Sequence, residues 1–226
     1  MTPGVAANIA AVRARIAHAA EQAGRDAGEI TLVGISKTHS AASVRAAFDA
    51  GLRDFGENRV QEASAKIDEL RAANVLPRWH LVGHLQRNKV AAAVDRFDIL
   101  HSIDSIRVAE AINERAAIPV RVLIEVNIGG EASKLGVAPA EASALAANIA
   151  KMRQLDLIGL MTVAPRVDDP EDVRPVFRRL RELRDAIGLR ELSMGMTDDF
   201  EVAVSEGSTL VRVGRAIFGD RAIEAR

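Results

Sequence analysis

The sequence predicts an α/β fold, a single (β/α)8 barrel of the TIM type, and three observations support this. Short apolar runs alternate eight times with longer amphipathic stretches, a pattern typical of parallel βαβ units. The chain has 226 residues, which suits a compact barrel, because this fold begins at about 200 residues. The glycine fingerprint of an open dinucleotide-binding sheet does not follow the first apolar run. A closed barrel therefore fits better than an open sheet.

The first predicted element is an extra helix, from about Pro3 to Ala23, that precedes the barrel. Thr2 suits the N-cap, Pro3 the first helical position, and Gly24 the residue just past the end. The apolar residues of this helix recur at spacings of three and four and share one face: Val5, Ile9, Val12 and Ile16.

Eight apolar runs are predicted to be the strands of the barrel. They are Ile30–Ser36, Leu52–Phe55, Arg78–Val82, Phe97–His101, Pro119–Ile128, Leu155–Val163, Glu191–Met194 and Thr209–Val213. The clearest helical pattern between them is Pro170–Ile187, whose apolar stripe ends at Gly188. No linker separates the runs, so residues 1–226 are expected to form one domain, with the helix at 1–24 and the barrel at 30–221.

Composition excludes several classes of function. The chain has no cysteine, which excludes disulfides, thiol catalysis and cysteine-bound metals, and no tyrosine, which removes a common acid/base residue. The net charge of −1 gives no general attraction to nucleic acid or to an anionic membrane. The N-terminus lacks a signal pattern, and charges interrupt every apolar run, so a cytoplasmic protein is expected.

In such a barrel the chemistry lies at the C-terminal ends of the strands, and Lys37 ends the first strand. Alternation puts Lys37 on the same face as Val33 and Ile35, so the amine stands at the barrel mouth if that face points inward. Partial desolvation there lowers the pKa of a lysine and frees its amine to form a Schiff base. The competing interpretation is a solvent-exposed lysine at a strand end.

Arg212 lies inside the last strand, and alternation turns it inward together with Leu210. A guanidinium at this place keeps its proton and must find an acceptor. Two acceptors are open: a carboxylate such as Glu125 on the fifth strand, or an anionic or heteroaromatic ligand.

The loops after the last two strands suggest a phosphate site. Gly214 follows the last strand directly, and the amides beyond it, from Arg215 onward, could point at phosphate oxygens. Thr197 could cap the helix that runs to Gly207 or offer its hydroxyl to the same anion, and the two roles are compatible because both use the positive end of a helix. The neighbouring pair Asp198–Asp199 would compete with a bound anion.

Asn58 follows the short second strand and is either a helix cap or a ligand contact. The ends of strands one, two, seven and eight adjoin once a barrel closes, so all these residues converge. An amine, an inward arginine and a phosphate cradle formed by two loops then meet in one cavity. That combination suits pyridoxal 5′-phosphate (PLP).

These residues lie in motifs that resemble a known family. The motifs are LVGISKTHS, FGENRVQEA, WHLVGHLQRNK, HSIDS, VNIGGEASKLG, GLMTVAP, LSMGMTDD and VRVGRAIFGDR. They run in order from about residue 30 to 221, and the chain resembles the YggS/PROSC group, the pyridoxal phosphate homeostasis proteins. The resemblance implies the single-domain barrel of the fold type III PLP enzymes.

The resemblance also assigns roles to the site residues. It implies that Lys37 holds PLP as an internal aldimine and that Arg212 hydrogen-bonds the pyridine nitrogen. Thr197 and the backbone after Gly214 would hold the phosphate, and Asn58 would lie near the cofactor. Thr197 stands where the family usually has serine, so the hydroxyl is retained. Arg215 stands where threonine is common and could add a charge-assisted bond.

The resemblance implies a non-enzymatic carrier or buffer of PLP that supports vitamin B6 balance. Its expected partners are PLP itself and, transiently, PLP-dependent apoenzymes, and its expected state is a monomer or weak homodimer. The alternative is an amino-acid racemase of similar fold. Alanine racemases pair their lysine with a tyrosine and carry a second, β-rich domain, both missing here. A racemase would need a substitute base such as His84 or Lys134.

Two other interpretations have less support. A metal site from His80 and His84 would need a helix, whereas this segment is predicted as strand then loop. Nucleic-acid binding would rest on five arginines of one helix: Arg174, Arg178, Arg179, Arg181 and Arg184. Four acidic residues interleave with them, so a solvated helix face is the simpler interpretation: Glu171, Asp172, Glu182 and Asp185.

Overall fold

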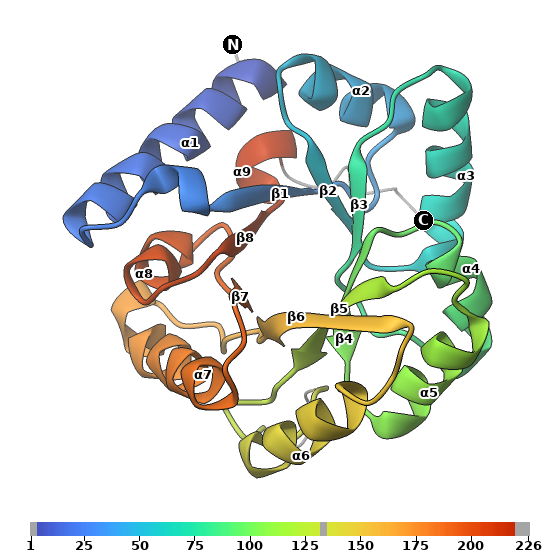
Figure 1. Cartoon of the computed structure of the whole chain (residues 1–226). Helices are drawn as coiled ribbons and strands as arrows, with labels where there is room; N and C mark the ends of the chain where they lie inside the picture. The colour runs from blue at the N-terminus through green and yellow to red at the C-terminus, as the bar shows by residue number, and fades with distance from the viewer. Residues whose placement is uncertain (1–3, 132–134, 220–226) are drawn as a thin grey trace.

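The computed structural model describes residues 4–131 and 135–219, in which eight parallel strands close into a barrel (Figure 1). The strands follow one another in chain order, and the last pairs with the first. They are β1 (Thr31–Ile35), β2 (Asp54–Glu57), β3 (Arg78–Leu81), β4 (Ile99–Ile103), β5 (Val120–Glu125), β6 (Leu155–Met161), β7 (Glu191–Ser193) and β8 (Leu210–Val213). The predicted (β/α)8 barrel is confirmed.

Helices surround the barrel on its outer side (Figure 1). The α-helices are α1 (Val5–Gln22), α2 (Ala41–Asp49), α3 (Val60–Ala72), α4 (Val90–Val94), α5 (Ile106–Arg115), α6 (Pro139–Ile149), α7 (Arg174–Ile187), α8 (Phe200–Ser205) and α9 (Arg215–Phe218). Short 3-10 turns occur at η1 (Ala27–Glu29), η2 (Arg87–Lys89) and η3 (Pro170–Val173). Among the helices of the described residues, none combines the length and the apolar character that crossing a bilayer requires.

The extra N-terminal helix is present as α1, beside α8 and α9 (Figure 1). Asn8 Nδ2 donates to the carbonyl of Ile217 at 2.9 Å, which joins α1 to the end of the barrel. The helix ends where predicted, because Gly24 takes a φ of +66° that favours glycine. The helix begins later than predicted, because Gly4 is its N-cap and Val5 its first residue, so the roles expected of Thr2 and Pro3 are not found. Thr2 and Pro3 themselves lie outside the described residues.

Apolar side chains form two layers, one in the barrel bore and one between strands and helices. In β1, Val33 points into the bore, whereas Leu32 packs in the outer layer, so the alternation predicted for this strand is confirmed. The apolar part of the bore is small and comes from five strands: Val33, Ile99, Leu123, Ile158, Met161 and Leu210. Polar side chains fill much of the remaining bore, as described below.

The second strand begins two residues later than predicted. The sequence suggested Leu52–Phe55, but β2 runs from Asp54 to Glu57. Leu52 is buried in the outer layer, where its side chain occupies the space that a Cβ on Gly34 would need. Leu52 thus packs in the layer under the helices before the strand begins, and Phe55 joins it there from within β2.

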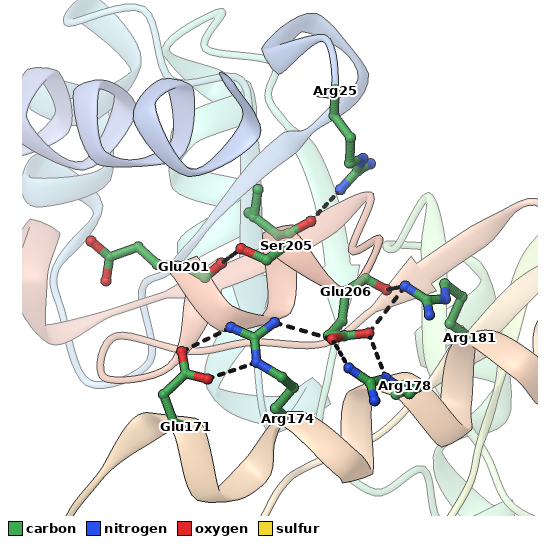
Figure 2. A network of polar contacts seen from close by, with 9 residues as sticks. Arg25, Glu171, Arg174, Arg178, Arg181, Glu201, Ser205 and Glu206 are labelled. Carbon is green, nitrogen blue, oxygen red and sulfur yellow. Dashed lines mark hydrogen bonds and ion pairs between the residues drawn. The ribbon is translucent and has the colours of Figure 1, made fainter. Parts of the chain in front are cut away.

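One carboxylate fastens α7 to the end of α8 (Figure 2). Glu206 is only 3% exposed, and a guanidinium nitrogen of each of three arginines lies 3.0 Å from its oxygens: Arg174, Arg178 and Arg181. Arg174 also pairs with Glu171 at 2.6 Å. These three arginines of the predicted basic helix are therefore engaged within the protein.

Candidate functional site

A cavity of about 320 Å³ opens at the C-terminal ends of β1, β7 and β8. It lies at the barrel end where the sequence places the chemistry. The structure brings together five of the predicted site residues in its lining: Lys37, Thr197, Arg212, Gly214 and Arg215. A larger hollow of about 660 Å³ lies at the opposite end, around Trp79 and Pro119, and holds none of them.

Lys37 is half-buried, two residues past the end of β1, and lines the cavity. The residue after it, Thr38, adopts a φ of +67°, which is strained for a β-branched residue and turns the chain sharply at this point. Lys37 is therefore part of the cavity wall and is not a fully exposed surface residue.

A buried ion pair anchors the backbone beneath Lys37. Ser36 donates its hydroxyl to Glu57 at 2.7 Å, and Lys66 from α3 contacts the same carboxylate oxygen at 2.6 Å. Lys66 also donates to the carbonyl of Ser36 at 2.7 Å. The sequence analysis did not identify this pair. Its signal was present, since Glu57 lies in the FGEN motif.

Arg212 is 5% exposed and faces the bore, as predicted. Its Nη1 donates to Ser193 Oγ at 2.6 Å and its Nη2 donates to the carbonyl of Thr162 at 2.8 Å. Burial lowers the pKa of Arg212 to about 10, against the opposing charges of Asp199 and Glu125. The guanidinium therefore stays protonated at neutral pH. Its hydrogen bonds go to neutral groups and not to a carboxylate, one of the two acceptors that the sequence left open.

Glu125 ends β5 and is 7% exposed. Burial raises its pKa to about 7, an effect that the charge of Arg212 opposes and that of Asp104 increases. Glu125 and Arg212, the pair that the sequence suggested, therefore interact through their charges and not through one of the hydrogen bonds of Arg212 described above.

Thr197 and Gly214 face the cavity from the loops after β7 and β8. The cap expected of Thr197 is not found, because α8 begins at Phe200 and Asp199 precedes it. Asp199 instead accepts the amide of Met196 at 2.6 Å. The hydroxyl of Thr197 therefore does not serve as the N-cap of that helix.

The start of α9 provides amides next to Gly214. The first intrahelical bond runs from the amide of Ile217 to the carbonyl of Gly214, so the amides of Arg215 and Ala216 precede it. Arg215 forms an ion pair with Asp198 at the cavity edge. This pair offsets the negative charge that would otherwise oppose an anion here.

Asn58 does not line this cavity. It lies in a neighbouring hollow with Gly83 and His84, and the helix after it has Arg59 as its N-cap, so the expected cap is not found either. Its backbone is closely packed, since a Cβ on Gly83 would meet the carbonyl oxygen of Asn58 at 2.2 Å.

The alternative bases and metal ligands lie in separate places. His84 Nδ1 is 3.0 Å from Asp104 Oδ2, in the hollow next to Asn58. His80 points into the bore, where it bonds His101 and Asp54. Within the described ranges, no cluster of three metal-ligating side chains occurs. Lys134, the other substitute considered, lies outside the described residues.

Comparison with known proteins gives consistent matches over the whole fold. The family described as the N-terminal domain of alanine racemase matches residues 7–222. The pyridoxal phosphate homeostasis protein of Pseudomonas aeruginosa is 44% identical over 222 residues, which cover 96% of each chain. PipY of Synechococcus elongatus, solved with PLP bound, is 34% identical with a TM-score of 0.83 and covers 95% of this chain and 100% of its own.

An alanine racemase from Corynebacterium glutamicum is a more distant neighbour. It is 20% identical with a TM-score of 0.69, and the match covers 95% of this chain but 64% of the racemase. A likeness at this identity shows a shared fold and nothing about shared chemistry.

Proposed function

Because this chain belongs to the pyridoxal phosphate homeostasis proteins, within the alanine racemase N-terminal domain family, we propose that it binds PLP covalently through Lys37. It acts as a carrier or buffer of PLP in vitamin B6 balance. The observation that carries this proposal is the lining of one cavity by a lysine, a buried arginine and residues of the loops after β7 and β8. PipY, a relative solved with PLP, supports it further.

The residues present fit the cofactor. A cavity of about 320 Å³ is in the size range of small-ligand sites. Arg212 keeps a permanent positive charge at the base of the cavity, and Arg215 with Thr197 adds donors at its rim. An anionic phosphate and a ring nitrogen with a lone pair both suit such a donor set.

Each residue has a role toward the cofactor. PLP supplies an aldehyde that bonds reversibly to a primary amine, and Lys37 is the amine. Thr197 donates its hydroxyl to the phosphate, together with the amides that follow Gly214 and the side chain of Arg215. Arg212 donates to the ring nitrogen, and its fixed charge disfavours protonation there, which weakens the ring as an electron sink. Asn58 approaches the cofactor from the neighbouring hollow.

The carrier role is favoured over catalysis. A two-base racemase needs a second acid/base group opposite the lysine, and the chain has no tyrosine. His84 is engaged with Asp104 in the neighbouring hollow. The protein acts in the cytoplasm as one domain, as a monomer or weak homodimer, and hands PLP to apoenzymes.

Borohydride reduction tests the attachment. Protein mixed with PLP is expected to show a visible absorption band that borohydride removes, and peptide mass spectrometry should place the pyridoxyl group on Lys37. Lys37→Ala should lose the adduct, whereas Lys151→Ala, in the exposed turn after α6, should keep it. An adduct on a different lysine contradicts the assignment, and a lack of any adduct contradicts PLP binding.

A racemase assay tests the carrier role. The protein loaded with PLP is expected to interconvert L- and D-alanine or serine negligibly. Turnover on the order of 1 per second would instead be typical of an enzyme and would overturn this part of the proposal.

A further inference from the structure

A continuous line of buried polar side chains crosses the barrel bore behind Arg212. Arg212 Nη1 lies 2.6 Å from Ser193 Oγ, and that oxygen lies 2.8 Å from His101 Nδ1. His101 Nε2 lies 2.9 Å from His80 Nδ1, and His80 Nε2 lies 3.0 Å from Asp54 Oδ1. We call these five residues the bore chain.

The bore chain joins opposite walls of the barrel. Asp54, His80 and His101 come from β2, β3 and β4, whereas Ser193 and Arg212 come from β7 and β8. His80, His101 and Ser193 are fully buried. A buried polar network of this kind is stable only when each donor meets an acceptor.

The two ends of the bore chain determine its direction. A guanidinium can only donate, so Ser193 accepts a hydrogen bond from Arg212. Its own hydroxyl group then donates a hydrogen bond to His101 Nδ1. His101 therefore carries its proton on Nε2 and donates it to His80 Nδ1. His80 likewise carries its proton on Nε2 and donates it to Asp54, which as a carboxylate only accepts. Each hydrogen bond of the bore chain then contains one proton, and both imidazole rings are neutral.

The reverse direction leaves a defect. If His101 donated from Nδ1, Ser193 would accept twice, and its own hydroxyl proton would have no acceptor in the bore chain. His80 would then have to donate from Nδ1 to His101 and from Nε2 to Asp54, which requires an imidazolium. That imidazolium would be a second buried cation in the bore, in addition to Arg212. Asp54 does not need that cation, because Arg78 already contacts it through Nε at 2.9 Å and Nη2 at 3.0 Å.

We propose that Ser193, His101 and His80 are positioning residues for Arg212, arranged as a one-way chain in which both histidines are neutral and protonated on Nε2. The chain holds the guanidinium by a neutral acceptor, so its full charge remains available to the cavity. The pKa of His101 agrees with a neutral ring, because burial holds it well below its usual value and the neighbouring His80 and Arg212 lower it further. The consequence for PLP rests on the proposed function, whereas the proton arrangement does not.

Nitrogen NMR on protein labelled at histidine tests the proton arrangement without PLP. Near neutral pH, His80 and His101 are each expected to show a protonated Nε2 and an unprotonated Nδ1, with Nε2 protons that exchange slowly. His18 supplies a matched histidine outside the bore, on α1. A proton on His101 Nδ1, or on both ring nitrogens of His80, would overturn the inference.

Serine variants test the link to Arg212. Ser193→Ala should shift the His101 Nδ1 resonance and weaken PLP binding about 10-fold to 100-fold, the usual effect of losing a hydrogen bond to a charged group. Ser193→Thr keeps the hydroxyl and should restore both. Ser208→Ala is the control, because Ser208 is equally buried but bonds only main-chain carbonyls of β7, β8 and the residue after β7.

These outcomes separate the inference from the proposed function. If the wild-type protein fails to bind PLP, the proposed function is wrong, but the NMR result still decides the direction of the bore chain. If Ser193→Ala and Ser208→Ala weaken PLP binding equally while both remain folded by thermal melting, Ser193 has no specific role in positioning Arg212.

Discussion

Arg212 Nη1 lies 2.6 Å from the hydroxyl of Ser193, and this neutral group, with the carbonyl of Thr162, holds the buried cation of the site. A carboxylate in the same place would cancel much of the charge and would leave less for a ligand. The arrangement therefore keeps a positive charge at the base of the cavity, directly behind the expected position of the cofactor ring.

Replacing Arg212 should weaken PLP binding while leaving the fold intact. Arg212→Gln removes the cation from the cavity but keeps a donor for Ser193, so PLP affinity is expected to fall about 10-fold or more. Titration of the visible absorption band measures this. Arg121→Gln, at the exposed opposite end of the barrel, should leave affinity unchanged. Equal effects of the two substitutions would argue against a contact between Arg212 and the cofactor.

The buried pair of Lys66 and Glu57 should be important for stability. Glu57 Oε2 is buried and, within the described residues, has no hydrogen-bond partner, so Lys66 supplies most of the compensation for its charge. Lys66→Met is expected to lower the free energy of unfolding by about 3–5 kcal/mol, and adding Glu57→Gln should restore part of it. Denaturant unfolding measures both.

The control for the Lys66–Glu57 pair is an exposed ion pair at the start of the same helix, α3. Arg59 contacts Glu62 at 3.0 Å, and both side chains are solvent-accessible. Arg59→Met should therefore change stability by less than about 1 kcal/mol. If Lys66→Met costs no more than this control, the buried pair does not stabilise the strand end that carries Lys37.

Glu125 should make stability depend on pH near neutrality. Its pKa rises from 4.5 to about 7 on folding because the side chain is buried, so the folded protein binds this proton more tightly than the unfolded chain. The contribution is fully favourable below pH 4.5 and is lost as the pH rises to about 7. The loss amounts to about 3 kcal/mol at most.

Substitution of Glu125 tests this effect. Glu125→Gln should remove the decline in stability over that range, as measured by unfolding at a series of pH values. Glu110→Gln, at an exposed position of α5, should retain the wild-type profile. An unchanged profile for Glu125→Gln would show that this carboxyl titrates normally.

Glu206 should hold α7 and α8 together. Its carboxylate is nearly buried and meets three guanidinium groups (Figure 2), so Glu206→Gln leaves the arginines to repel one another. We expect a loss of about 3 kcal/mol or more in the free energy of unfolding. Glu171→Gln, which removes an exposed partner of Arg174, should cost less than about 1 kcal/mol. Similar losses for both would contradict a central role for Glu206.

The sequence predicted the fold and most of the cavity for local reasons. Apolar runs of strand length recur between amphipathic stretches. Parallel strands that are connected by helices in this way can form only a few sheet topologies, and a closed barrel is one of them. Alternation within a strand is also local, so the inward direction of Arg212 followed from its position in β8. The interpretation of Thr197 as a cap was wrong, because the carboxylate of Asp199 folds back onto Met196 and moves the start of α8.

What the sequence by itself determined is the barrel, the end at which the candidate site lies, and the residues there whose side chains suit PLP. Only the tertiary structure decided what holds those residues. His101 and Ser193 are 92 positions apart and meet because the closed barrel brings β4 and β7 together across its bore. The partner of Arg212 therefore depends on the register of eight strands, a long-range property that no local pattern contains.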